Sequence, residues 1–161
     1  IMAVDMFMKL DKIAGESADK VHKGEIDVLA WSWGMSNSGT THQGSGGGSG
    51  KVSVQDLSFT KYVDKSSPTL MTYCCTGKHL PVANLVVRKA GGSPLEYIKI
   101  KMEDCIVSSI STGGSGGEDR LTENVTLNFA KVHLDYSPQK ADGSGDTAIP
   151  MSWDIAGNAK A

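Results

Sequence analysis

The chain has 161 residues, about one domain of ordinary size, and this length can build a core without disulfides or metals. Apolar residues make up 39% and charged residues 21%, which excludes wholesale disorder and collagen. The net charge is −2, and no basic run is longer than Arg88-Lys89, so we expect no nucleic-acid binding. The aliphatic stretches are far too short for a membrane-spanning helix, so we expect no membrane insertion.

The first two predicted elements are strands. Residues 4–10 alternate between apolar and polar side chains, and the polar residues 11–24 then predict a loop. Residues 25–33 predict a second strand. Its alternation assigns two faces, one with Ile26, Val28, Ala30 and Ser32 and the other with Asp27, Leu29, Trp31 and Trp33. Because both faces are largely apolar, we expect the core to cover one and a second subunit or another layer to cover the other.

Residues 34–51 predict an extended glycine-rich loop. Its centre consists of Gly44, Ser45, Gly46, Gly47, Gly48, Ser49 and Gly50. A tract of this composition has too few apolar side chains to pack on its own domain, so it predicts a flexible projection.

The next two elements are a strand and a helix. Residues 52–60 predict a strand whose phase shifts between Val54 and Leu57, which is typical of a β-bulge. Residues 66–76 form the one convincing helical pattern. Ser66 is the predicted N-cap, Pro68 lies in the first turn, and Gly77 lies just past the end.

Strands follow at residues 81–88, 95–103 and 105–111, with a bend expected between the last two. Residues 121–136 predict a long strand whose apolar residues change phase after Phe129, which is typical of a bulge or bend that closes a sheet. Met151 and Trp153 mark a last short strand. The predicted fold is all-β. It is a closed or nearly closed antiparallel β-barrel of two packed sheets with one short side helix, in a single domain over residues 1–161.

Two short segments match catalytic or phosphate-binding motifs in part, but their surroundings in the sequence do not support those functions. Residues 113–117 match the nucleophile-elbow pattern, and Asp119 and His133 follow in triad order, but the next predicted element is a strand where an elbow needs a helix. The tract ending at Gly50-Lys51 lacks two required residues of a phosphate-binding loop. The four histidines and three cysteines show no metal-ligand spacing, and the cysteines are expected to be reduced. We therefore predict no catalytic residue, no cofactor and no metal.

Four segments resemble the Hcp family, the haemolysin-coregulated tube proteins of bacterial type VI secretion. They are MAVDMF at residues 2–7, EIDVLAWSWG at 25–34, VQDLSFTKY at 54–62 and GGSGGEDRLTEN at 113–124. These unusual segments match in order and span nearly the whole chain.

The resemblance implies a structural protein without enzymatic activity that forms homohexameric rings. The rings stack into a tube that a contractile sheath propels, together with a spike protein, and the ring lumen binds effectors for export. Such a protein is made in the bacterial cytoplasm and then secreted to the extracellular space or a target cell.

Under this reading Ala30 and Ser32 are candidate cargo contacts in the lumen, and Trp31 and Trp33 belong to the core. The tract Gly44 to Gly50 is the candidate for stacking between rings. Two other readings stay open. One is a monomeric β-barrel binding module for sugar or peptide ligands that uses the tryptophan strand, and the other, ranked last, is a hydrolase.

Overall fold

A computed structural model describes residues 4–39, 51–90 and 94–161. The strands are β1 Val4–Leu10, β2 Ile26–Ser32, β3 Met35–Asn37, β4 Val52–Val54, β5 Leu57–Tyr62, β6 Leu80–Lys89, β7 Leu95–Thr112, β8 Thr122–Tyr136 and β9 Ile149–Asp154. The helix α1 is Ser67–Thr76.

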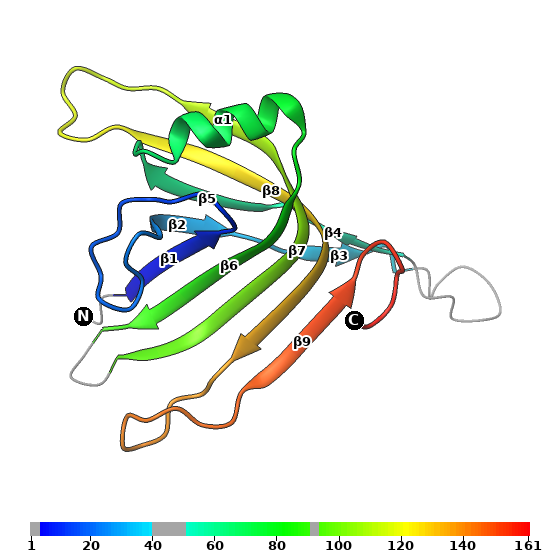
Figure 1. The fold of residues 1–161 in the computed structure, drawn as a ribbon. Coiled ribbons are helices and arrows are strands. Elements are labelled where there is room, and N and C mark those ends of the chain that lie inside the picture. Colours follow the sequence, from blue (N-terminus) through cyan, green and yellow to red (C-terminus); the bar gives the residue numbers. More distant parts are fainter. Residues whose placement is uncertain (1–3, 40–50, 91–93) are drawn as a thin grey trace.

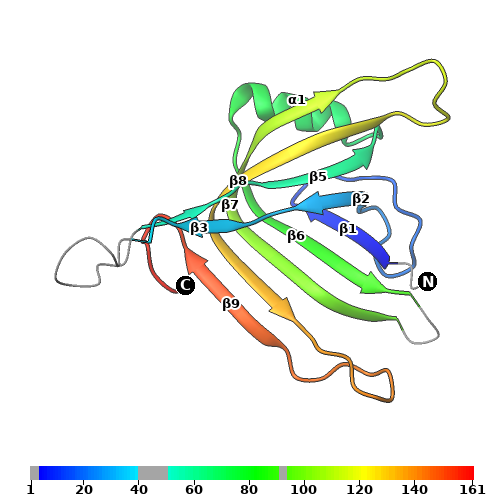
Figure 2. The ribbon, with the colours of Figure 1, turned by 180° about the vertical axis from the view of Figure 1, so that it is seen from behind.

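One large antiparallel sheet forms the body of the molecule. Its strand order is β5-β2-β1-β6-β7-β8-β9, and β5 also pairs with β8, which closes the first six of these strands into a barrel (Figure 1). Strand β9 extends the sheet from β8 outside the closed barrel, as the view from behind also shows (Figure 2). The predicted all-β barrel with one side helix is confirmed.

The inside of the barrel is filled by side chains. All six barrel strands contribute fully buried apolar residues, among them Met8, Ile26, Leu57, Leu85, Ile100 and Leu127. Alternation along each strand sends these residues inward and leaves their neighbours outside. The interior of the barrel is therefore a packed core.

Two long strands bend together where the sequence predicted a bend. Asp104 in β7 has a φ of 54°, and buried residues lie on both sides of it at Met102 and Cys105. Strand β8 changes phase at the same level, between Phe129 and Val132. Because both strands change phase together, the pairing on either side stays in register and the sheet curves into a barrel.

Helix α1 packs against β7 through Leu70 and ends as predicted at Gly77, whose φ is 68°. Ser66 occupies the N-cap position, as predicted, but without capping geometry. The backbone of Ser66 is itself helical and its side chain makes no capping bond. Its hydroxyl donates a hydrogen bond to Asp64 instead.

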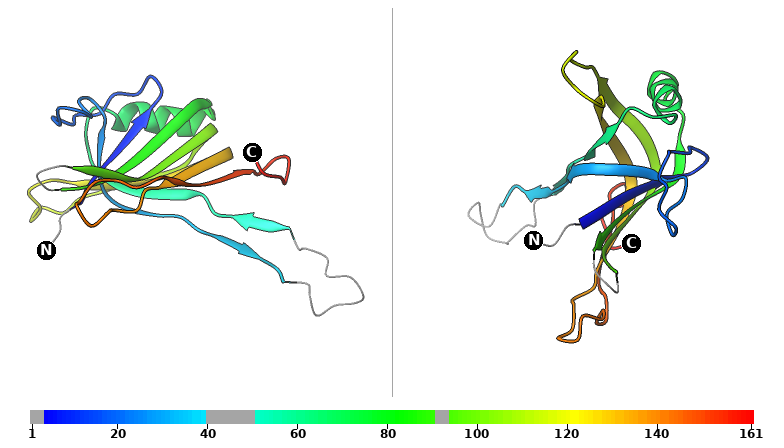
Figure 3. Two further views of the ribbon diagram at one scale, coloured as in Figure 1. Left: turned by 90° about the horizontal axis from the view of Figure 1, so that it is seen from below. Right: turned by 90° about the vertical axis from the view of Figure 1, so that its left-hand side faces the viewer.

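The predicted loop at residues 34–51 is wrong at its start, where β3 forms, whereas β4 begins at Val52 as the predicted 52–60 strand does. Strands β3 and β4 pair there as an antiparallel hairpin that projects from the barrel (Figure 3), because Val52 and Val54 take up strand pairing with Asn37 and Met35. The expected bulge in the 52–60 strand is a break between β4 and β5. The tract Gly44 to Gly50 lies outside the described residues.

The three cysteines are free thiols, as predicted. Burial raises the pKa of the Cys105 thiol to about 12. In the described ranges no helix is long and apolar enough to cross a membrane.

Candidate functional site

The candidates Ala30 and Ser32 lie on the outer face of β2, where both are exposed. The prediction that they share a face with Ile26 and Val28 is wrong, because the pairing of β2 with β5 shifts register between Val28 and Ala30. This bulge changes which side chains of the strand face the core. Ile26 and Val28 are buried in the core, and the side chains after the bulge alternate in the opposite phase.

The tryptophans follow the bulge onto the core side. Trp31 and Trp33 are half-buried and pack against the hydrophobic core, as predicted. The indole Nε1 of Trp33 donates a hydrogen bond of 2.9 Å to the carbonyl of Gln55, and its ring lies 6.3 Å from that of Phe129. The Trp33 ring is therefore held by contacts of the fold on at least two sides.

With the bulge in place, β2 has one apolar face and one mixed face. Only Leu29, which is 39% exposed, remains as a large apolar side chain on the outside of this strand. The expectation that both faces are largely apolar is therefore wrong, and it no longer argues for a second subunit.

A shallow groove of about 190 Å³ surrounds the two candidates. Its lining residues come from three neighbouring strands and are Ala30, Trp31, Ser32, Ser58, Phe59, Thr60 and Asn124. Ser58 and Thr126 are joined through their hydroxyls at 3.2 Å, and Thr60 donates to Asn124 at 2.7 Å. The polar side chains of the groove are thus short and uncharged, and the half-buried Trp31 lines the groove beside them.

This polar face continues past the groove onto β7. Asp56 accepts hydrogen bonds from Ser108 at 2.8 Å and from Asn128 at 2.9 Å, and all three residues are exposed or half-buried. The sequence analysis missed Ser58, Thr60 and Asn124 as site residues. Alternation in β5 and β8 could have placed them outside, but only the pairing of β5 with β2 and β8 brings them beside Ser32.

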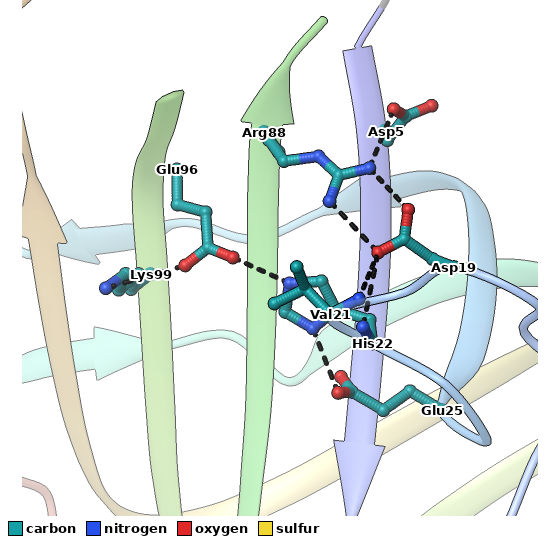
Figure 4. A network of polar contacts seen from close by, with 8 residues as sticks. All are labelled: Asp5, Asp19, Val21, His22, Glu25, Arg88, Glu96 and Lys99. Carbon is teal, nitrogen blue, oxygen red and sulfur yellow. Dashed lines mark hydrogen bonds and ion pairs between the residues drawn. The ribbon is translucent and has the colours of Figure 1, made fainter. Parts of the chain in front are cut away.

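A second polar cluster holds the loop between β1 and β2 (Figure 4). The buried His22 ring contacts Glu25 through Nδ1 at 2.9 Å and Glu96 through Nε2 at 2.7 Å, and it stacks on Phe7. Burial lowers the pKa of His22, but the hydrogen bonds to Glu96 and Glu25 outweigh it, and the net shift is upward. Both ring nitrogens face carboxylates, so the protonated ring fits the cluster best.

Next to His22, Arg88 joins β6 to the same loop. Its guanidinium contacts Asp19 at 2.7 Å and Asp5 at 3.2 Å. The bond from Arg88 holds the pKa of Asp19 well below its usual range, so this carboxylate stays charged. The cluster fixes a loop in place and offers no free nucleophile.

A buried ion pair lies under helix α1. The Lys61 ammonium is 0% exposed and contacts Glu123 at 2.5 Å, Asp64 at 3.0 Å and the Ser67 hydroxyl at 3.1 Å. Ser67 also donates to Glu123. A serine beside a lysine can act as a nucleophile, but this serine is only 2% exposed, so the arrangement fastens the helix to the barrel.

The structure does not support the hydrolase hypothesis. Residues 113–117 lead into β8 and not into a helix, and His133 lies on β8, where it contacts Glu103 at 3.1 Å. Among the described residues, no group of three or more His, Cys, Asp and Glu side chains could hold a metal ion.

Comparison with known proteins gives a consistent result. Residues 7–136 match the family described as "Type VI secretion system effector, Hcp". The protein hcp1 of Pseudomonas aeruginosa is 63% identical over 162 aligned positions, which cover 99% of this chain and all of that protein.

Solved structures agree with this match. The crystal structure of Hcp1 from Salmonella typhimurium has a TM-score of 0.79 at 40% identity, with 99% of this chain and 100% of that chain covered. A structure described as a type six secretion system protein has a TM-score of 0.92 at 33% identity, with the same coverage of both chains.

Proposed function

The chain belongs to the Hcp family of type VI secretion proteins, and we propose on this premise that it forms hexameric rings that stack into the tail tube. The family's place in type VI secretion, as a secreted tube protein that assembles with itself, carries over to this chain. In our proposal residues 1–161 act as one barrel domain. The protein is made in the bacterial cytoplasm and leaves through the machinery that it helps to build.

We propose that the outer face of β2, β5 and β8 lines the lumen and contacts effectors. The observation that carries this assignment is the shallow groove of short, uncharged polar side chains around Ser32. Side chains of this kind remain hydrated when the lumen is empty, and they can exchange water for hydrogen bonds to a cargo surface. Bulky or charged side chains there would narrow the pore or repel part of the cargo.

We assign the β3–β4 hairpin, and with it the tract Gly44 to Gly50 that joins β3 to β4 in the sequence, to contacts between stacked rings. In support, the hairpin projects away from the barrel (Figure 3), so it can reach a neighbouring subunit. The spike protein and the contractile sheath complete the set of partners that the family implies. The role is structural and needs no catalysis, cofactor or metal.

The monomeric binding module is not favoured. That reading needs free tryptophan rings as a platform for a sugar or peptide. Trp31 and Trp33 pack against the core, and the indole Nε1 of Trp33 is already bonded to the Gln55 carbonyl.

Substitution of Ser32 by arginine tests the lumenal assignment. Because Ser32 is exposed, the long side chain can stay hydrated, so S32R should keep the hexamer mass and a thermal midpoint close to that of the parent. It should lose co-purification of a co-expressed type VI effector, because a ring repeats the obstruction in every subunit.

The matched control is S115R, which adds the same charge in the exposed loop between β7 and β8. This variant should keep the effector. If S32R rings retained the effector as well as S115R rings do, cargo contacts would lie elsewhere.

A further inference from the structure

We propose that a groove beside the β1–β2 loop binds an acidic, partly apolar peptide segment of another protein. The groove, here called the lysine groove, has a volume of about 470 Å³ and is lined by Lys9, Lys12, Lys23, Ile13, Val21 and Glu25, among others. The β1–β2 loop, which supplies most of its lining residues, lies on the side of the barrel away from the projecting hairpin (Figure 3). The inference does not depend on ring formation or on the lumenal face.

The loop that forms the groove is ordered by its own hydrogen bonds. The amide of Gly15 donates to the carbonyl of Gly24 at 2.8 Å, Gly24 donates to Ser17 at 2.9 Å, and Ser17 donates to Glu25 at 2.9 Å. A side chain at Gly15 would meet the Glu25 carbonyl at 2.5 Å, so the two arms of the loop are in close contact. A partner would therefore meet a surface that is already formed, which lowers the entropic cost of binding.

The charges in the groove are unbalanced. Lys9, Lys12 and Lys23 are exposed, and within the described part of the chain no ion pair joins any of them to an acidic side chain. Lys12 also has a left-handed backbone with a φ of 63°, a conformation that costs on the order of 1 kcal/mol in a residue with a side chain.

Three carboxylates of the same segment are already engaged. Glu16 accepts a hydrogen bond from the amide of Lys65, Asp19 contacts Arg88, and Glu25 contacts His22 (Figure 4). Glu25 lines the groove, but its charge is directed to the histidine. Asp19 and Glu25 are thus paired with cationic side chains of the fold, while Lys9, Lys12 and Lys23 face solvent.

The same groove offers apolar surface. Leu10 and Ile13 form a buried floor, and Val21 stands on the rim with 71% of its surface exposed. An occupant should therefore carry carboxylates with at least one apolar side chain between them. The groove fits a single peptide segment better than a membrane, which would need a broad apolar face ringed by cations.

The test uses the full-length protein and a short synthetic peptide in which glutamates alternate with leucines. Fluorescence anisotropy at low salt should show binding, and a carbodiimide should cross-link the peptide's carboxylates to Lys9, Lys12 and Lys23. A peptide with lysines in place of the glutamates should not bind. The triple variant K9Q/K12Q/K23Q should bind the acidic peptide about tenfold more weakly, because it loses three charge contacts.

The matched control is K65Q/K131Q/K160Q, which removes the same charge from exposed positions outside the groove. It should keep the parent's affinity. V21S should lower the affinity for the glutamate–leucine peptide but not for a peptide of glutamates alone, because only the leucines contact the apolar rim.

Three results would overturn the proposal. The first is an equal loss of peptide affinity in both triple variants, and the second is cross-linking of the peptide to lysines outside the groove. The third is that the protein binds phosphatidylserine vesicles in preference to the peptide. If the carbodiimide instead joined the groove lysines to carboxylates of a second copy with no peptide present, the occupant would be this chain itself.

Discussion

At the scale of single residues, the buried contact between Lys61 and Glu123 fixes where helix α1 lies. Removing one member of such a pair leaves the other charge buried without a partner, which typically costs about 3 to 5 kcal/mol. We therefore expect K61M to lower the free energy of unfolding by about that amount in urea or thermal melts.

The double variant K61M/E123Q should recover part of the loss, because the fully buried carboxylate of Glu123 is then gone and the amide can still accept a hydrogen bond from Ser67. K65M at an exposed lysine is the control and should change little. A K61M protein as stable as the parent would show that the pair contributes nothing to the fold.

His22 makes stability depend on pH. The pKa of His22 in the folded chain is raised above its ordinary value of 6.5 through its bonds to Glu96 and Glu25. The protonated ring therefore stabilises the fold fully below pH 6.5, and this contribution is lost as the pH rises through the raised pKa. Other charges near the ring are Arg88, Asp19 and Lys99 (Figure 4).

The measurement is the difference in thermal midpoint between the parent and H22Q across neutral and mildly alkaline pH. It should be largest at the acidic end and shrink as pH rises. H79Q, at a histidine that is exposed, is the control substitution. A difference that grows with pH would mean that the neutral ring is the stabilising form.

At the scale of elements, alternation predicted the strands well but not where a strand turns over. The pattern of residues 25–33 is compatible with a regular strand and with a bulged one, because Leu29 and Ala30 can each face either the core or solvent. Only the pairing of β2 with β5 decides it. The same limit explains why the sequence found Ser32 but not Ser58, Thr60 or Asn124, which depend on long-range pairing.

Patterns that rest on local chemistry did better. Gly77 ends α1 in the left-handed conformation that the sequence predicts. The predicted change of phase within residues 121–136 is also confirmed by the burial pattern of β8. Ser66 failed as a cap because Asp64, two residues earlier, takes its hydroxyl. Lys61 and Glu123 are buried, although charged residues usually lie on the surface. No local sequence pattern predicts a buried ion pair of this kind.

The β3–β4 hairpin gives a prediction at this scale. Its base is anchored, because Met35, Val52 and Val54 share an apolar pocket with Met151 and Trp153 of β9. Deleting residues 45–49 should therefore leave hexamers of normal stability while impairing tube formation under conditions in which the parent polymerises.

Electron microscopy of the polymerised samples is the measurement for this deletion. The substitution of residues 45–49 by an equal number of serines serves as a length-matched control. Tubes of normal length from the deletion protein would show that residues 45–49 are not needed for ring stacking.

At the scale of the whole molecule, the barrel is filled with side chains, so the function has to come from surfaces. Two surfaces stand out among the described residues. The groove around Ser32 has no charged side chain among its lining residues, whereas the lysine groove carries three lysines and is lined by different residues. The first serves the proposed lumen, and the second is free for a partner outside it.

The central claim is that this chain forms a ring, and native mass spectrometry tests it most directly. At micromolar concentration the spectrum should show a dominant species of six copies of the 17.0 kDa chain, together with multiples of that species if rings stack. A persistent monomer under the same conditions would contradict the ring and return the monomeric binding module to first place.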